Sequence, residues 1–164
     1  MLSFDVFVGK FPEIKLPVSL SEEQASEFAG INDPLSERLI LEHLQPSAQM
    51  YGDFDDELTE YVPCLRIPDL TEFIALVVWR ASLAGYQYIL YTFERGGKLI
   101  DRAVIGGTYW EDDIITRSVA RIDEDLTVYI VSSQTTGEHE GFDPASSTTR
   151  EYEILPDGKI VELA

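Results

Sequence analysis

The sequence has few of the residues that build disulfides and metal centres. Its 164 residues include one cysteine, Cys64, and two histidines, His43 and His139. A single cysteine cannot form an intrachain disulfide, which is typical of a protein in a reducing compartment. A zinc site would need both histidines together with carboxylates from distant segments. We therefore expect neither a bound metal nor a cofactor.

Positive charge is scarce as well. The chain has 12 Lys and Arg residues against 30 Asp and Glu residues, and its net charge is −18. The acids are densest in residues 1–60, which hold 13 acids and 3 bases. A field of this sign repels nucleic acid and anionic membranes and attracts basic proteins. We expect no nucleic-acid binding, and the charge serves either solubility alone or the recruitment of a basic partner.

Long apolar runs are absent. Residues 73–79 (FIALVVW) form a run of seven apolar residues, which is too short to span a membrane and suits a strand buried on both faces. Asp5, Lys10, Glu13 and Lys15 interrupt the N-terminal segment, so no signal peptide is expected. These features predict a cytoplasmic protein without membrane insertion.

Catalytic motifs with a defined spacing are missing too. The sequence contains no Gly-x-Ser-x-Gly nucleophile motif. Gly96, Gly97 and Lys98 lead into a strand-like run rather than the helix that a phosphate-binding loop requires, so they predict a hairpin turn. Cys64 lies within an apolar run and is interpreted as an inert buried thiol.

Two acidic segments are weak candidates for metal binding. Residues 53–57 (DFDDE) lack the glycine of a calcium-binding EF-hand loop, so a solvated acidic loop is expected there. In residues 138–140 (EHE), neighbouring side chains of an extended chain point to opposite sides and cannot converge on one ion. His43 is interpreted as a partly exposed packing residue on a helix.

From residue 61 onward the sequence reads as strand-like runs joined by turns. Residues 95–98 (RGGK) and 156–159 (PDGK) have the chemistry of tight hairpin turns. Consecutive hairpins favour an antiparallel meander over a βαβ unit, which needs a helical crossover. Pro63 limits the first of these strands to an edge position. Gly106 and Gly107 are expected to break the pattern after residue 105, and residues 134–147 have the composition of a long loop.

Two short helices are expected before the strands. Ser21 fits an N-cap, with Gln24 at the capping-box position. Residues 32–34 (Asn-Asp-Pro) are expected to open a second helix, with Asp33 as its cap, and Gln45 and Pro46 are expected to end it. The sequence thus predicts a single α+β domain over residues 1–164 that is mostly β. Its helical and extended part, residues 1–60, precedes an antiparallel meander of about seven strands, residues 61–164, which forms a curled sheet or partial barrel.

Three patches along the chain carry a resemblance. They are Phe11-Pro12 with Leu16-Pro17, residues 91–101 (YTFERGGKLID) and residues 157–160 (DGKI). In this order and spacing the chain resembles a group of uncharacterised bacterial proteins, mostly from Bacteroidetes-type genomes. The resemblance covers most of the chain as a pattern of strands and turns, and it implies no activity and no functional residue.

The best candidate for an exposed site is a pair of aromatic residues beside three acids: Tyr109, Trp110, Glu111, Asp112 and Asp113. Aromatic residues in a polar surface often anchor interfaces, although Trp110 could instead cover one end of the sheet. The first hypothesis is a non-enzymatic, inhibitor- or immunity-like protein that presents an acidic surface to a basic protein. The second is a small-molecule binder or hydrolase with these residues at its site and residues 134–147 as a lid. A component of an envelope or secretion assembly is a third.

Overall fold

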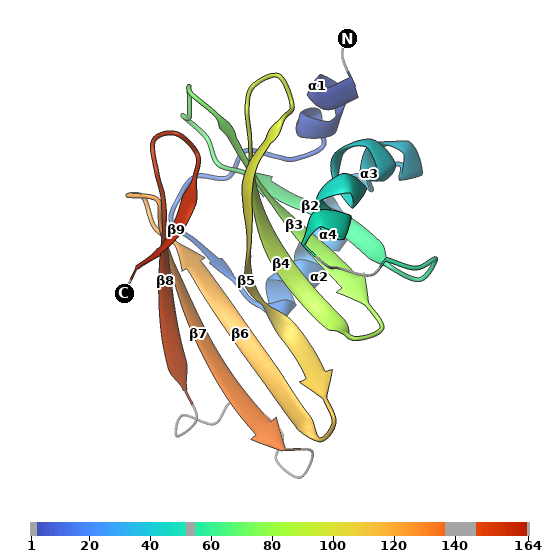
Figure 1. The fold of residues 1–164 in the computed structure, drawn as a ribbon, viewed down its shortest axis with the longest axis vertical. Helices are drawn as coiled ribbons and strands as arrows, with labels where there is room; N and C mark the ends of the chain where they lie inside the picture. Colours follow the sequence, from blue (N-terminus) through green and yellow to red (C-terminus); the bar gives the residue numbers. More distant parts are fainter. Residues whose placement is uncertain (1–2, 52–54, 137–146, 164) are drawn as a thin grey trace.

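The computed structural model describes residues 3–51, 55–136 and 147–163, and shows helices gathered in the N-terminal third with strands after them (Figure 1). The helices are α1 (Ser3–Gly9), α2 (Glu22–Ile31), α3 (Glu37–His43) and α4 (Gln45–Met50). The strands are β1 (Val18–Leu20), β2 (Glu60–Arg66), β3 (Ile74–Ser82), β4 (Gly85–Phe93), β5 (Leu99–Glu111), β6 (Ile114–Ile122), β7 (Thr127–Thr136), β8 (Thr148–Ile154) and β9 (Ile160–Leu163).

The predicted fold class is confirmed, while the numbers of elements differ. Within the described ranges the meander has eight strands, β2 to β9, where about seven were expected, and four helices accompany it where two were expected. None of the helices in these ranges is long and apolar enough to cross a membrane.

The strands form one antiparallel sheet whose order follows the sequence. Each strand from β2 to β9 pairs with the next, and the sheet is open, with β2 and β9 at its two ends. Because β2 is an end strand, the predicted edge position of Pro63 is confirmed. The register between β2 and β3 shifts between Pro63 and Leu65. The short strand β1 lies off this path and pairs with residues 120–122 at the end of β6.

Two glycines in the middle of β5 lie where this strand begins to pair with a second neighbouring strand. Its ladder with β4 shifts between Val104 and Gly106, which marks a bulge, and from Gly107 onward β5 also pairs with β6. Gly107 has a φ of 130°, and a Cβ there would lie 2.0 Å from the carbonyl oxygen of Tyr86. The prediction that these glycines break the strand is therefore wrong. They form the bulge that bends β5, so that it begins to pair with β6 while it stays paired with β4 as far as Tyr109.

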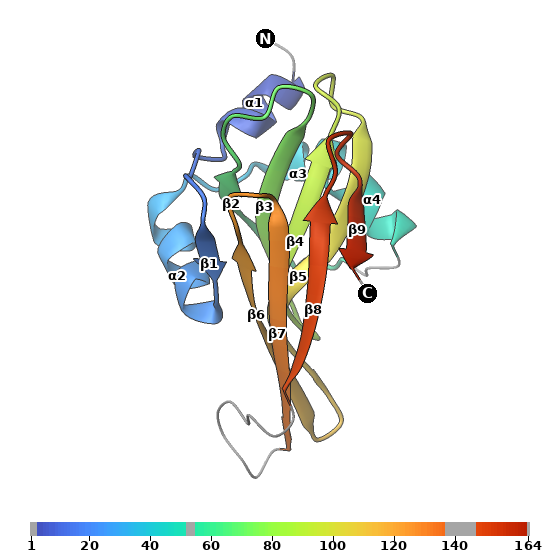
Figure 2. The same ribbon diagram turned by 90° about the vertical axis from the view of Figure 1, so that its left-hand side faces the viewer.

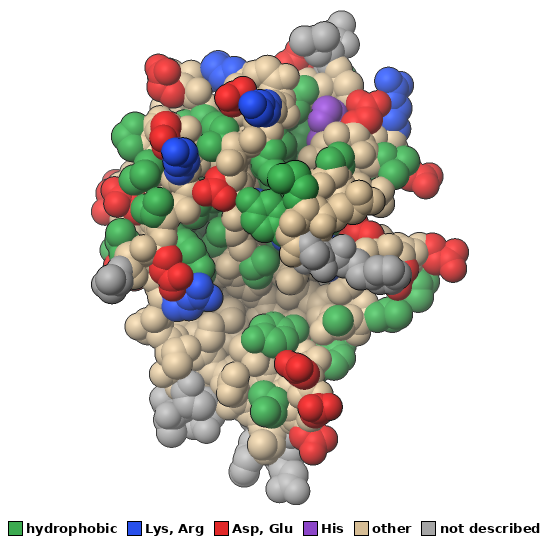
Figure 3. All heavy atoms as spheres, in the orientation of Figure 1, with side chains coloured by type: hydrophobic (Ala, Val, Ile, Leu, Met, Phe, Trp, Pro, Cys, Tyr) green, Lys and Arg blue, Asp and Glu red, His purple; other side chains and the backbone are tan. Residues whose placement is uncertain are grey.

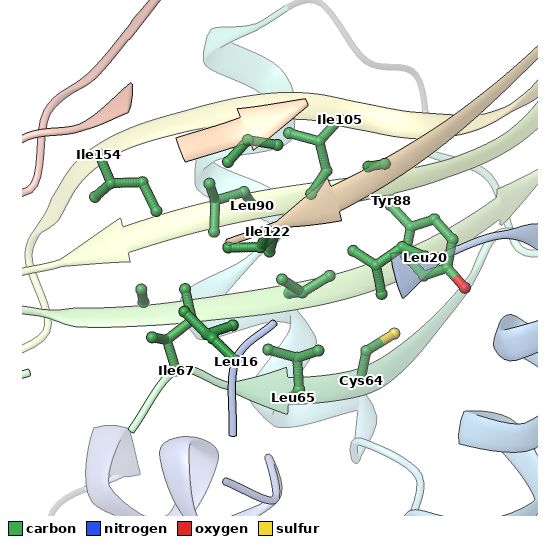
Figure 4. Packing of buried hydrophobic residues seen from close by; sticks show 14 of the residues in the cluster. Leu16, Leu20, Cys64, Leu65, Ile67, Tyr88, Leu90, Ile105, Ile122 and Ile154 are labelled. Atoms are coloured by element: carbon green, nitrogen blue, oxygen red, sulfur yellow. The ribbon is translucent and has the colours of Figure 1, made fainter. Parts of the chain in front are cut away.

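The sheet curls over itself and encloses the main core. In Figure 2, β6, β7 and β8 lie in front of β2 to β5, and Figure 4 shows side chains from both halves meeting between them. Val77 and Leu90 from the first half and Ile122 and Val128 from the second are fully buried in this cluster. Burial of each such side chain contributes about 1.5–3 kcal/mol, so this cluster holds the two halves of the sheet together.

A second core lies on the outer face of β3 and β4, under α1, α3 and α4 (Figure 1). Phe7 and Leu44 are fully buried there and belong to one cluster with Val78 and Ile89 of the sheet. Val77 lies in the main core and Val78 in this one. The prediction that residues 73–79 are buried on both faces is thereby confirmed.

The helix α3 begins later than the sequence predicted. Ser36 caps it by accepting a hydrogen bond from a backbone amide in the first turn. The predicted start at residues 32–34 is wrong: these residues lie in the connection between α2 and α3, and α2 ends at its cap residue Asn32. Its side-chain amide donates to the carbonyl oxygens of Pro63 and Cys64, at 2.7 and 3.0 Å, and so ties the end of α2 to the edge strand β2.

Gln45 and Pro46 end α3, as predicted, but the chain remains helical after them. α4 begins at Gln45, with Pro46 in its first turn, where the missing N–H breaks no helical hydrogen bond. The proline therefore separates two helices instead of starting a loop.

Candidate functional site

The predicted site residues lie on the β5–β6 hairpin, at the lower end of the sheet in Figure 1. Tyr109, Trp110 and Glu111 belong to β5, so the prediction of a loop there is wrong for these three. Asp112, with a φ of 55°, and Asp113 form the turn. Because neighbours along a strand point to opposite faces, the two aromatic rings lie on the two sides of the sheet, with Tyr109 49% and Trp110 43% exposed.

Trp110 both covers the sheet and remains accessible. Its ring packs edge-to-face on Tyr86 of β4, with ring centroids 5.7 Å apart. Tyr86 in turn stacks on Trp79 of β3, at 5.6 Å. This row of three rings fixes the orientation of Trp110 and leaves its outer edge open to a ligand or partner.

A hollow of about 600 Å³ lies between this hairpin and the β3–β4 turn, and we call it the hairpin pocket. Leu83 of that turn, 67% exposed, supplies apolar surface together with Tyr109 and Trp110. Asp56 and Glu111 add carboxylates to its lining. Its volume falls within the range of about 300–1,000 Å³ that is usual for ligand sites.

A buried ion pair lies at the base of the hairpin pocket. Arg80 of β3 donates from Nε and Nη2 to Asp55 Oδ1, at 2.9 and 2.6 Å, and only 5% and 10% of the two side chains are exposed. The Tyr61 hydroxyl donates to Asp55 Oδ2 at 2.5 Å. Burial, together with this hydrogen bond, raises the pKa of Tyr61 well above its ordinary value, so the phenol stays protonated.

This pair corrects the prediction of a solvated acidic loop at residues 53–57. Asp55 is held by Arg80 instead of facing water, while Asp56 stays exposed and accepts a hydrogen bond from the Leu58 amide. Asp53 lies outside the described residues. The lone arginine after the apolar run 73–79 is the signal that could have predicted the pair, because a buried guanidinium requires a carboxylate.

A second hollow, of about 450 Å³, lies on the other side of Tyr109, and we call it the polar groove. Two rows of residues cross it from strand to strand, and the strand register determines which residues each row contains. The rows are Gly107, Ser118, Ser132 and Thr148, and Tyr109, Thr116 and Gln134. In Figure 3 this part of the surface is a hollowed area of uncharged polar side chains and backbone, and acidic side chains gather at the end of the β5–β6 hairpin.

The two hollows share a wall. Tyr109 and Gln87 line both of them, and Gln87 also accepts a long hydrogen bond of 3.5 Å from Arg80 Nη1. Sequence reasoning found Tyr109 but missed Gln87 and the rows of serine and threonine, because their convergence depends on strand register. Of the predicted lid, residues 134–147, residues 134–136 belong to β7, and residues 137–146 lie outside the described part of the chain.

The remaining chemical candidates do not form a catalytic site in the described residues. Cys64 is fully buried, and burial raises the pKa of its thiol, so the prediction of a buried thiol is confirmed. Ser3 Oγ lies 2.9 Å from His43 Nε2 and donates to Glu42 Oε2 at 2.5 Å. Glu42 also approaches Nε2 of the imidazole, at 3.6 Å. A catalytic triad needs the acid on Nδ1, opposite the serine, so this arrangement is not one.

His43 packs in the helical core. Its ring stacks on Phe7 with centroids 4.8 Å apart and meets Phe4 edge-on at 5.6 Å, and 12% of the side chain is exposed. Burial lowers the pKa of His43 below 6.5, although the neighbouring Glu42 opposes the shift. The imidazole is therefore more easily protonated in the unfolded chain than in the folded protein.

This difference predicts a pH dependence of stability. The contribution of neutral His43 is fully present above the unfolded pKa of about 6.5 and is lost as the pH falls below it. We expect His43→Phe, which keeps an aromatic ring against Phe7, to remove this loss. The free energy of unfolding of the wild type minus that of the variant should fall between about pH 7.5 and pH 5, as measured by urea denaturation. A constant difference over that interval would contradict the assignment.

Comparison with known proteins found no match: no family model matches the chain, and neither the curated proteins nor the solved structures show a significant match. The described residues contain no group of three or more His, Cys, Asp or Glu side chains placed to hold a metal ion.

Proposed function

We propose that the protein binds a basic protein, whose lysine or arginine side chain enters the hairpin pocket. The observation that supports this proposal is the placement of exposed Tyr109, Trp110 and Leu83 beside the carboxylates of Asp56 and Glu111 around one hollow. Aromatic and carboxylate groups together suit a guanidinium or ammonium group, which binds ring faces and forms charge-assisted hydrogen bonds. Such a surface suits the inhibitor- or immunity-like role expected from the composition.

The charges around the pocket support the same class of partner. Asp112 and Asp113 extend the acidic rim along the hairpin turn, and both are exposed. Arg80 is the one basic residue among the described residues of the lining, and its charge is compensated by Asp55 at 2.6 Å. The net charge of −18 adds long-range attraction, which accelerates the encounter with a cation and weakens as salt is added.

A labelled peptide of arginines spaced by glycine and serine tests the proposal by fluorescence anisotropy at low and at physiological salt. A protein this acidic attracts such a peptide at many points, so an uncharged change at the pocket is the decisive variant. We expect Trp110→Ala to weaken binding at least about tenfold, as the loss of a central aromatic anchor does. We expect Glu111→Gln to weaken binding less and to reduce its salt dependence.

Tyr129→Ala is the matched control. Tyr129 is a partly exposed aromatic residue on β7, with Asp125 and Glu151 nearby, and it is outside the hairpin pocket. We expect this variant to bind the peptide as the wild type does. Equal losses in Trp110→Ala and Tyr129→Ala, or no loss in either, would show that attraction is spread over the whole surface and would reject the pocket.

A further inference from the structure

The polar groove differs in chemistry from the rest of this acidic surface. None of the described residues that line it is an Asp or Glu, although the chain contains 30 of them. Arg150, the one basic residue among its described lining residues, is neutralised by Glu162, to whose two carboxylate oxygens it donates at 2.8 and 3.0 Å. Among the described residues, the lining of the groove therefore carries no uncompensated charge, within a protein that is otherwise strongly negative.

The rows of the groove present hydroxyl and amide groups at regular intervals. Ser118 and Ser132 are cross-strand neighbours whose Oγ atoms lie 2.7 Å apart, and Thr148 continues the same row on β8. The parallel row is formed by Thr116, which is buried and lies two residues before Ser118 on β6, and by Gln134, which is exposed and lies two residues after Ser132 on β7. Each hydroxyl can donate and accept, as can the amide of glutamine. Neighbouring strands hold these groups about 4.8 Å apart, so they form a fixed two-dimensional array.

Apolar surface borders this array on two sides. Tyr109 lies at one end, half exposed, where its ring can cover the face of a bound molecule. At the other side the groove is lined by Ile105 and Ile130, both buried, and by Val104, which is 41% exposed. Polar groups converging on a concave surface with apolar borders are typical of small-molecule sites, and the volume of about 450 Å³ is in the usual range.

We propose that the polar groove is a binding site for a neutral carbohydrate of one or two sugar rings. A sugar has hydroxyl groups that donate and accept, which suits the rows of serine, threonine and glutamine, and C–H faces that suit Tyr109. A cationic ligand would find no carboxylate among the described lining residues, and an anionic ligand would find Arg150 already paired. This site is separate from the basic-partner site, and the two share only the wall formed by Tyr109 and Gln87.

Titration of the full chain with matched sugars, followed by ligand-observed NMR, tests the proposal. The probes are glucose against glucuronate, and N-acetylglucosamine against glucosamine, with cellobiose and N,N′-diacetylchitobiose as two-ring members. We expect the neutral member of each pair to bind more tightly. Preference for glucosamine would show general attraction by the negative surface, and a failure of all neutral probes to bind would overturn the proposal.

Variants place the binding in the groove. Tyr109→Ala is expected to weaken sugar binding about tenfold by removing the ring. Ser118→Ala and Thr148→Val are each expected to weaken it about fivefold by removing one hydroxyl. Trp110→Ala is the matched control, since Trp110 is the next residue on the opposite face with a similar exposure. Affinities that remain unchanged in Tyr109→Ala and Ser118→Ala would place the sugar elsewhere and refute the site.

The same variants separate this proposal from the basic-partner proposal. Trp110→Ala should weaken binding of the arginine peptide and leave sugar binding unchanged, whereas Ser118→Ala should weaken sugar binding and leave peptide binding unchanged. Melting temperatures of all variants are measured first, and Thr148→Val, at an exposed position at the start of β8, provides a second readout if Ser118→Ala unfolds.

Discussion

Replacement of Asp55 by alanine is expected to destabilise the protein by about 3–5 kcal/mol, because it removes one partner of a buried ion pair. Arg80 would lose the two hydrogen bonds, at 2.9 and 2.6 Å, that it donates to this carboxylate, and Tyr61 would lose its acceptor. A domain of this size has a total stability of about 5–15 kcal/mol, so a loss of this size is a large share of it. Urea denaturation followed by circular dichroism measures the change.

A pair of the same length on the surface provides the control. Arg121 and Asp123 also approach to 2.6 Å, but 57% and 29% of their side chains are exposed. Asp123→Ala is expected to change the unfolding free energy very little, since water and salt screen exposed pairs. Similar losses in the two variants would show that burial does not decide the cost.

A double variant separates pairing from packing. In Asp55→Leu/Arg80→Met both charges are replaced by apolar groups of similar size, which removes the desolvation cost together with the attraction. We expect it to be more stable than Asp55→Ala. A double variant as unstable as the single one would mean that the ion pair itself, with its link to Tyr61, holds β2 against β3 at this end of the sheet.

Local chemistry in the sequence was sufficient to predict the meander. Turn segments 95–98 and 156–159 lie where hairpins form, with positive φ at Gly97 and Gly158, and Pro63 lies on the edge strand beside a bulge. In each case the decisive interaction is between residues close in sequence, or is a property of one residue type. The same reasoning failed where a distant partner decides, as at Asn32, which donates to the carbonyl oxygens of β2 instead of opening a helix.

For the same reason, only the part of the candidate site that is contiguous in the chain could be predicted from the sequence. Tyr109, Trp110 and their acidic neighbours are adjacent in the chain, so their cluster is visible in the sequence. The row of Gly107, Ser118, Ser132 and Thr148 exists only through strand register, and a shift of one residue would turn each of these side chains to the other face. Each serine or threonine on its own is an ordinary strand residue with no functional signal.

Gly107→Ala is expected to destabilise the protein by about 3 kcal/mol, because it combines backbone strain with overpacking. The φ of 130° is one that L side chains rarely adopt, and the new Cβ would lie 2.0 Å from the Tyr86 carbonyl oxygen. That oxygen belongs to β4, so neither strand can move without disturbing the ladder between them. Guanidinium denaturation of the variant measures the loss.

Gly106→Ala is the control that the chain itself offers. Gly106 is the preceding residue at the same bulge, but its φ is not positive, and an added Cβ would make an ordinary contact of 3.4 Å with Ser118 and Tyr88. We expect it to cost about 1 kcal/mol or less. A large loss for Gly107→Ala alone would establish that this one position forces the bend of β5 toward β6. Because Tyr109 follows two residues later, the same bend sets the wall between the hairpin pocket and the polar groove, and equal losses at both glycines would contradict that account.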